Sequence, residues 1–229
     1  MSLFGALVDL VLPRACVGCG GGVGPLCPRC VPDMPALRVV AAATTWATWA
    51  AAPYDGALRT ALLAYKERGR RDLAGPLAGL LARAVEAALA ERAPPAGAET
   101  VLVPVPSARA AAASRGGDHV ARLGRRAAPV SGLRMVRGGL ALTRQVRDSA
   151  GLSRQERAAN LAGAFVAHPA PPRFAAIIVD DIVTTGATLR EACRALESAG
   201  WPVRGCAVVA ATQRRLCTSI GRAQPHGLA

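Results

Sequence analysis

The chain has 229 residues, of which 52% are hydrophobic and 19% charged, a composition that supports a buried core and excludes global disorder. Its formal net charge is +13, and of the 28 basic residues only Lys66 is a lysine, an arginine bias typical of GC-rich coding. Aromatic residues make up 3%, too few for the base-stacking surface of a single-strand-binding protein. A basic surface still attracts polyanions, including phosphate metabolites and nucleic acid.

The sequence gives no sign of membrane insertion or export. No apolar run approaches the roughly 18–20 residues that a membrane span needs. The apolar start, Met1–Leu12, has neither a basic beginning nor a convincing cleavage site, so it does not resemble a signal peptide. We therefore expect a globular, cytoplasmic protein without a membrane partner, and an oligomer is compatible with the sequence.

Four cysteines near the N-terminus form two CxxC pairs, which seven residues separate: Cys16, Cys19, Cys27 and Cys30. Each pair presents two thiolates from one tight turn, and two such turns complete a tetrahedral sulfur shell for zinc. Two disulfides are disfavoured in a reducing cytoplasm, and a thioredoxin-type redox pair lacks its βαβ context. We predict a structural zinc module over residues 1–36, because four cysteines leave no open position for catalysis, and a main domain over residues 37–229.

The remaining chain alternates between strand and helix patterns. Expected strands are Leu37–Ala52 (one or two), Thr100–Val105, Leu133–Val136, Phe174–Val179 and Val203–Ala210. Expected helices are Asp55–Lys66, Asp72–Arg92, Asp118–Arg126, Arg154–Asn160 and Gly186–Ala199. The alternation predicts an α/β fold with a parallel sheet flanked by helices.

Several residues outside these elements carry expectations of their own. Trp46, Trp49 and Tyr54 are predicted core residues, and Cys193 a small buried hydrophobe. The polar, glycine-punctuated stretch Arg137–Ser153 is predicted to be a mobile loop, and the tail from about Thr212 to be ragged or disordered.

The most informative segment follows the predicted strand Phe174–Val179. Asp180 and Asp181 come at its end, and a turn of threonine and glycine opens the next helix: Thr184, Thr185, Gly186, Ala187 and Thr188. A helix N-terminus binds phosphate through its unpaired N–H groups, and carboxylates accept hydrogen bonds from sugar hydroxyls. The combination indicates a receptor for a ribose 5-phosphate, although a merely acidic strand end has the same appearance.

Two other phosphate-binding motifs are excluded. A P-loop needs G-x-x-x-x-G-K-[ST], but the only lysine lies in YKERG. A dinucleotide fingerprint fails as well, because the glycines at 20–24 follow no strand and belong to the cysteine pairs.

The segment VDDIVTTGATL resembles the binding motif for phosphoribosyl pyrophosphate (PRPP) in type I phosphoribosyltransferases. The cysteine pairs, YDGALRTALLAYKERG, VPVPSARAAAASRGGDHVARLG and LTRQVRDSAGLSRQERAANLAGAF follow in an order and spacing similar to the ComF family. These competence-protein-F-like phosphoribosyltransferases include members linked to DNA uptake. Where the family commonly has RGFNQ, this chain has Arg115–His119, and Ser149–Ala150 replace a glutamine before GLS. Both departures leave the acceptor's identity open.

The resemblance implies roles for particular residues. Asp180 and Asp181 would hold the ribose 2- and 3-hydroxyls, and residues 184–188 would surround the 5-phosphate. Pyrophosphate would lie near Lys66 and the loop after the strand at residues 100–105, with these candidates: Pro106, Ser107, Ala108, Arg109 and Arg115. Arg157 and Asn160 match the family's R-x-x-N pattern. His119 and His168 show no partner in the sequence and are interpreted as structural or exposed.

The resemblance also implies a mechanism. Pyrophosphate would leave the ribose C1, magnesium and arginines would stabilise it, and a nitrogen nucleophile, which the sequence does not identify, would attack. Two alternatives stay open. One is a regulator that senses PRPP without transferring it. The other is a DNA-uptake accessory protein whose zinc module and positive charge contact DNA or a helicase partner.

Overall fold

The computed structural model describes residues 15–40, 46–107, 117–143, 160–213 and 216. Its main sheet has six strands in the order β1-β2-β8-β7-β3-β4, of which β1 is antiparallel to its neighbour and the other five run parallel. Their bounds are β1 (Leu37–Arg38), β2 (Thr48–Pro53), β3 (Glu99–Pro104), β4 (Arg134–Met135), β7 (Phe174–Val183) and β8 (Val203–Ala211). The central strands are almost wholly buried, as expected where helices cover both faces.

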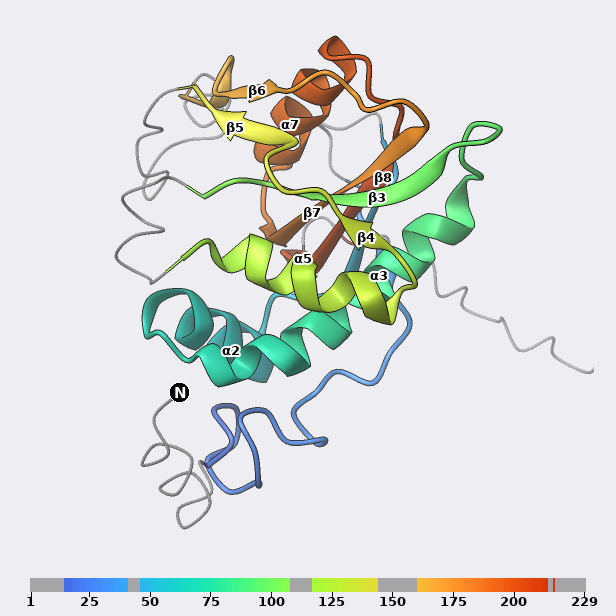
Figure 1. The fold of residues 1–229 in the computed structure, drawn as a ribbon. Coiled ribbons are helices and arrows are strands. Elements are labelled where there is room, and N and C mark those ends of the chain that lie inside the picture. The colour runs from blue at the N-terminus through green and yellow to red at the C-terminus, as the bar shows by residue number, and fades with distance from the viewer. Residues whose placement is uncertain (1–14, 41–45, 108–116, 144–159, 214–215, 217–229) are drawn as a thin grey trace, which may run out of the picture.

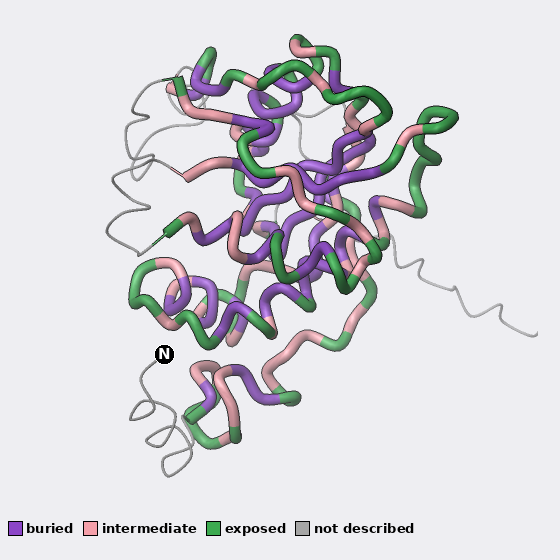
Figure 2. The backbone as a smooth tube through the Cα atoms, viewed as in Figure 1, coloured by how far each residue is buried: buried purple, intermediate pink, exposed green. Residues whose placement is uncertain are grey.

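Helices and a small second sheet cover the two faces of the main sheet (Figure 1). One face carries α2 (Gly56–Glu67), the 3-10 turn η1 (Arg71–Leu73), α3 (Ala74–Glu91) and α5 (His119–Val130). The other carries α7 (Ala187–Ser198) and the antiparallel pair of β5 (Leu140–Leu142) and β6 (Phe165–Ala167). Buried side chains gather where these layers meet the sheet, as Figure 2 shows. The predicted α/β fold with flanking helices is confirmed.

The two central strands β3 and β7 are neighbours, but the chain leaves them toward opposite faces. Among the described residues, the next helix after β3 is α5, on the face of α2 and α3, and the helix after β7 is α7, on the other face. Such a reversal opens a crevice at the carboxyl ends of the two strands, where open α/β sheets bind their ligands. The topology therefore marks the ends of β3 and β7 as the place for a site.

Two differences from the sequence prediction come from strand pairing, and the helix predicted over Asp118–Arg126 continues to Val130. Strand β7 does not stop at Val179 but runs to Val183, because β8 continues to pair with it as far as Ala211. The stretch predicted as a loop, Arg137–Ser153, contains β5, which is stabilised by pairing with β6 further along the chain. Of the predicted helix at residues 154–160, only Asn160 lies within the described residues.

Part of the predicted ragged tail is ordered. The N–H of Thr212 donates to the carbonyl of Val183, and Leu216 forms a bridge with Val39. The rest of the tail, from residue 217, lies outside the described residues.

One continuous helical stretch, Arg71–Glu91, is long and apolar enough to span a membrane by length and composition, with a mean hydropathy of 1.4. Of its most apolar window 56% is buried inside the protein, and α3 packs against β2, β8 and α5. This position is that of a core helix in an α/β protein.

The cysteine-rich segment packs onto the face of the protein that carries α2 and α3. Cys16, Leu26 and Cys27 belong to the same buried cluster as the inner faces of α2 and α3. From α3, Arg83 donates hydrogen bonds to the carbonyls of Pro32 (2.9 Å) and Ala51 (3.2 Å). The segment thus shares a core with the domain that follows it.

The other predicted core residues lie as follows. Trp46, Trp49 and Tyr54 are half-buried at the edges of the two clusters. Cys193 is fully buried, as predicted, with its sulfur 3.6 Å from that of Cys206.

Candidate functional site

The two adjacent aspartates lie inside β7 rather than after it. Asp180 and Asp181 are 8% and 4% exposed, in the part of β7 that continues beyond the end of β3. Each carboxylate accepts the next backbone N–H, Asp180 from Asp181 and Asp181 from Ile182, both at 2.8 Å. The pair therefore lies where the connections after β3 and β7 turn to opposite faces of the sheet, which we call the switch point. Backbone hydrogen bonds within the strand hold both side chains there.

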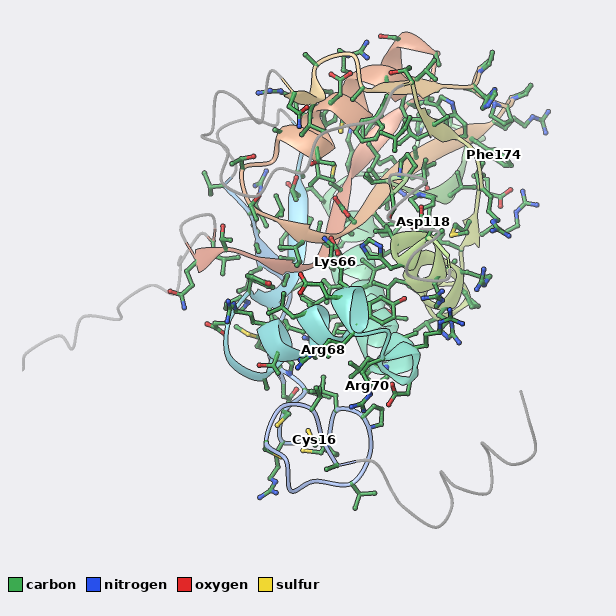
Figure 3. All side chains as sticks on the ribbon, turned by 90° about the vertical axis from the view of Figure 1, so that its left-hand side faces the viewer. Cys16, Lys66, Arg68, Arg70, Asp118 and Phe174 are labelled. Carbon is green, nitrogen blue, oxygen red and sulfur yellow. The ribbon has the colours of Figure 1, made fainter. Side chains whose placement is uncertain are left out.

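Asp181 is held by two side chains from other elements. Lys66 of α2 places Nζ 3.2 Å from Asp181 Oδ2, and His119 of α5 places Nε2 2.9 Å from the same oxygen. Figure 3 shows Lys66 on the side of α2 that faces the sheet, close to the start of α5 at Asp118. Lys66, a sequence-predicted candidate, is thus brought to the aspartate pair.

His119, interpreted from the sequence as structural or exposed, is buried and has partners that the sequence does not reveal. The side chain is 5% exposed, and both ring nitrogens have partners, since Nδ1 lies 3.1 Å from Ser107 Oγ. Its carbonyl also accepts a hydrogen bond from the Tyr65 hydroxyl at 3.0 Å. One signal could have found it: Asp118 and His119 stand where the resembled family has the asparagine and glutamine of RGFNQ. His168, the other histidine that the sequence analysis interpreted as structural or exposed, is exposed.

Ser107 connects this histidine to the cap of α5. The Asp118 carboxylate accepts from the N–H groups of Val120 and Ala121, which caps the helix, and from the N–H of Ser107 at 2.9 Å. The hydroxyl of Ser107 donates to Asp118 Oδ1 at 3.2 Å. A hydrogen-bonded chain thus runs from Asp118 through Ser107 and His119 to Asp181.

The two aspartates differ in protonation. Burial, followed by the neighbouring charge of Asp181, raises the pKa of Asp180 well above its ordinary value. Burial would also raise the pKa of Asp181, but the His119 hydrogen bond and the Lys66 charge outweigh it and hold this pKa well below its usual range. Asp181 therefore ionises first, and Asp180 holds its proton to higher pH than an ordinary aspartate.

The turn after β7 leads into α7 through a left-handed glycine. Gly186 precedes α7 with φ 79°, a left-handed backbone that glycine adopts without strain. Thr185 Oγ1 accepts from the N–H of Ala187 at 3.3 Å, while Thr184 is exposed and Thr185 and Thr188 are half-buried. The first turn of α7 directs its backbone N–H groups and positive dipole end toward this edge of the sheet.

The remaining pyrophosphate-side candidates divide between described and undescribed residues. Pro106 and Ser107 are half-buried directly after β3, where the N–H of Val105 still donates to the carbonyl of Val179. Ala108, Arg109 and Arg115 lie outside the described residues, as does Arg157.

The four N-terminal cysteines meet in one cluster, on the side of α2 away from Lys66 (Figure 3). Their sulfur atoms all lie within 4.8 Å of one another, and those of Cys19 and Cys27 are 3.7 Å apart. A tetrahedral site with Zn–S bonds of about 2.3 Å has sulfur–sulfur distances of about 3.8 Å, so the cluster could bind zinc.

The electrostatics of the cluster also suit a cation. The backbone N–H of Cys27 donates to the sulfur of Cys16 and, although burial opposes it, lowers the pKa of Cys16 to about 6. Burial and the three neighbouring sulfurs raise the pKa of Cys30 to about 12. Four thiolates can share this space only with a positive charge among them, which a divalent metal supplies.

A glycine makes the cluster this compact. A Cβ on Gly22 would come within 2.5 Å of Cys27 Cβ and 2.6 Å of its sulfur. No larger residue fits there without displacing a potential ligand.

Part of the chain matches a known protein family. The family model described as the phosphoribosyl transferase domain matches residues 142–218, which include β7, the turn, α7 and β8. A search of curated proteins found no match. Together with the parallel sheet, the match supports a fold of the phosphoribosyltransferase type, and phosphoribosyl transfer as the general class of activity, in a chain with a four-cysteine cluster near its N-terminus.

Proposed function

We propose that the protein binds PRPP with magnesium and transfers its phosphoribosyl group to a nitrogen acceptor, with release of pyrophosphate. The observation that carries this proposal is the position of the aspartate pair and the 184–188 turn at the switch point between β3 and β7. Carboxyl groups, which suit sugar hydroxyls, and a helix start, which suits a phosphate, follow one another in the chain there, from Asp181 in β7 to Ala187 at the start of α7.

The 5-phosphate would bind at the start of α7. The left-handed Gly186 lets the backbone approach an anion closely, and the hydroxyls of Thr185 and Thr188 add donors. The macrodipole of the 12-residue helix favours negative charge at this end.

The ribose would lie over Asp180 and Asp181. Its hydroxyls can donate to the Asp181 carboxylate and exchange hydrogen bonds with the carboxyl group of Asp180. As pyrophosphate leaves, C1 becomes oxocarbenium-like, and a fixed negative charge nearby stabilises it more than it stabilises the ground state. Because Lys66 and His119 hold Asp181, its carboxylate needs no reorganisation during the reaction.

Pyrophosphate would lie toward Lys66 and the loop that begins at Pro106 and Ser107. Lys66 has a 35% exposed side chain and carries a positive charge at this edge of the sheet. Magnesium, held mainly by the ligand and by water, supplies further neutralisation of the leaving group. By resemblance, Arg109 and Arg115 belong to the same side, because one guanidinium group can donate two parallel hydrogen bonds to phosphate oxygens.

For the N-terminal module we propose a structural zinc ion on Cys16, Cys19, Cys27 and Cys30. The full set of four sulfurs leaves no position for a substrate. The module packs against α2, whose other side carries Lys66, so the metal would stabilise the helix that supports the site. This arrangement agrees with the proposed kinship to the ComF family, which rests on the sequence motifs.

Calorimetric titration of PRPP with magnesium into the zinc-loaded protein tests the proposed function. We expect micromolar binding that is lost in the double variant Asp180→Asn/Asp181→Asn and retained in Asp33→Asn, a matched change at an exposed aspartate. Pyrophosphate release in the presence of nucleobases or amines then separates a transferase from a sensor, which would bind without release. Absence of binding to the folded wild-type protein would refute both.

A further inference from the structure

The hydrogen bonds of both ring nitrogens indicate that His119 does more than fill space in the core. An ionised carboxylate cannot donate, so the contact of Nε2 with Asp181 Oδ2 (2.9 Å) requires the ring proton on Nε2. The other nitrogen, Nδ1, meets the Ser107 hydroxyl, which has a single proton to give. The state of the ring therefore depends on where that hydroxyl proton points.

Ser107 has two partners between which its proton can turn. Its oxygen lies 3.2 Å from Asp118 Oδ1 and 3.1 Å from His119 Nδ1. When the hydroxyl donates to Asp118, Nδ1 must donate to Ser107, and the ring is a positively charged imidazolium. When the hydroxyl donates to Nδ1, the ring is neutral, and Asp118 keeps its bonds from Val120 and Ala121. Rotation of one hydroxyl thus accommodates either state while the bond to Asp181 is kept.

We propose that His119 is a positioning residue that holds Asp181 through Nε2 and takes up a proton on Nδ1 when an anionic ribose phosphate binds beside it. The inference rests on the proposed function, since the ligand must occupy the Asp180–Asp181 edge. A ligand with several negative charges favours the charged form of any titratable group near it. Histidine is the side chain whose charge changes most readily near neutral pH.

The groups around the ring set the balance between its two states. Among the described residues, the titratable or charged groups that face or adjoin it are Tyr65 and Lys66 on α2, Asp180 and Asp181 on β7, Arg122 on α5 and Asp118 at the cap of α5. Added negative charge from the ligand shifts this balance toward the imidazolium.

Calorimetry in buffers of different ionisation enthalpy measures the protons taken up per PRPP bound. Near pH 7, the wild-type protein should take up between about 0.3 and 1 proton more than His119→Gln. The glutamine amide can still donate to Asp181 but cannot take up a proton. His168→Gln, at an exposed histidine, is the matched control and should behave as the wild type. The affinity deficit of His119→Gln should be about 3- to 10-fold at pH 6 and should disappear near pH 8.

The possible results distinguish a failure of this inference from a failure of the proposed function. Equal proton uptake by the wild type and His119→Gln, or an equal affinity deficit at both pH values, would overturn this inference and leave the proposed function intact. Absence of PRPP binding to the wild type would overturn both. If the variant does not fold, nitrogen NMR of the wild-type ring decides: Nε2 should stay protonated while Nδ1 titrates, and PRPP should raise the midpoint. An unprotonated Nε2, or an unmoved midpoint, would contradict the inference.

Discussion

Replacing Asp180 by asparagine is expected to stabilise the folded protein at neutral pH. Asp180 is 8% exposed and adjoins the ionised Asp181, so its own ionisation is unfavourable. Asparagine has the same shape and can still accept the hydrogen bond from the N–H of Asp181. The substitution therefore removes the buried titratable group without creating a cavity or losing the backbone bond.

The size of the gain depends on pH in a defined way. The folded-state pKa of Asp180 lies well above the ordinary value of 3.8, so the folded protein retains a proton that the unfolded chain releases. The stability that comes from this proton is complete below the unfolded pKa and is lost as pH rises through the folded pKa. The advantage of Asp180→Asn should thus grow by about 1.4 kcal/mol per pH unit between the two pKa values and then stay constant.

Urea denaturation followed by circular dichroism, at several values between about pH 5 and 8, measures this advantage. Asp33→Asn, at an exposed position, controls for the loss of one acidic group. Comparison at each pH also removes the effect of zinc release at acid pH, which both proteins share. A destabilised variant, or an advantage that does not change with pH, would refute the assignment of the retained proton to Asp180.

Two further substitutions test the supports of the site. Lys66→Met should lower the free energy of unfolding by about 1–3 kcal/mol at pH 7, between the values for exposed and buried ion pairs, because Asp181 loses a cation 3.2 Å away. The loss should shrink at acid pH as Asp181 protonates, and Lys66→Arg should restore part of it; a loss independent of pH would contradict the ion pair. Gly22→Ala should abolish stoichiometric zinc in elemental analysis, since its Cβ would overlap Cys27, whereas Gly21→Ala, with open space around it, should retain it. A full zinc content in Gly22→Ala would exclude the observed cluster as the metal site.

The sequence by itself determined the features that depend on neighbouring residues. The CxxC pairs need only tight turns to bring their sulfurs together, and the cluster forms as predicted. The turn at 184–186 and the helix after it follow from threonine and glycine in front of an apolar stripe. The periodic patterns located most helices and strands to within a few residues, because helix and strand periods are local properties.

The tertiary structure alone decided where those elements end and what surrounds the aspartates. Strand β7 extends to Val183 because β8 pairs with it, and β5 exists because β6 lies beside it. His119 lies 62 residues from Asp181 in the chain, and no local pattern joins them. They meet because the switch point directs the segments after β3 and β7 to one edge. Burial raises the pKa of Asp180 there, while the His119 hydrogen bond and the Lys66 charge lower that of the equally buried Asp181, a difference between chemically identical side chains that only their surroundings create.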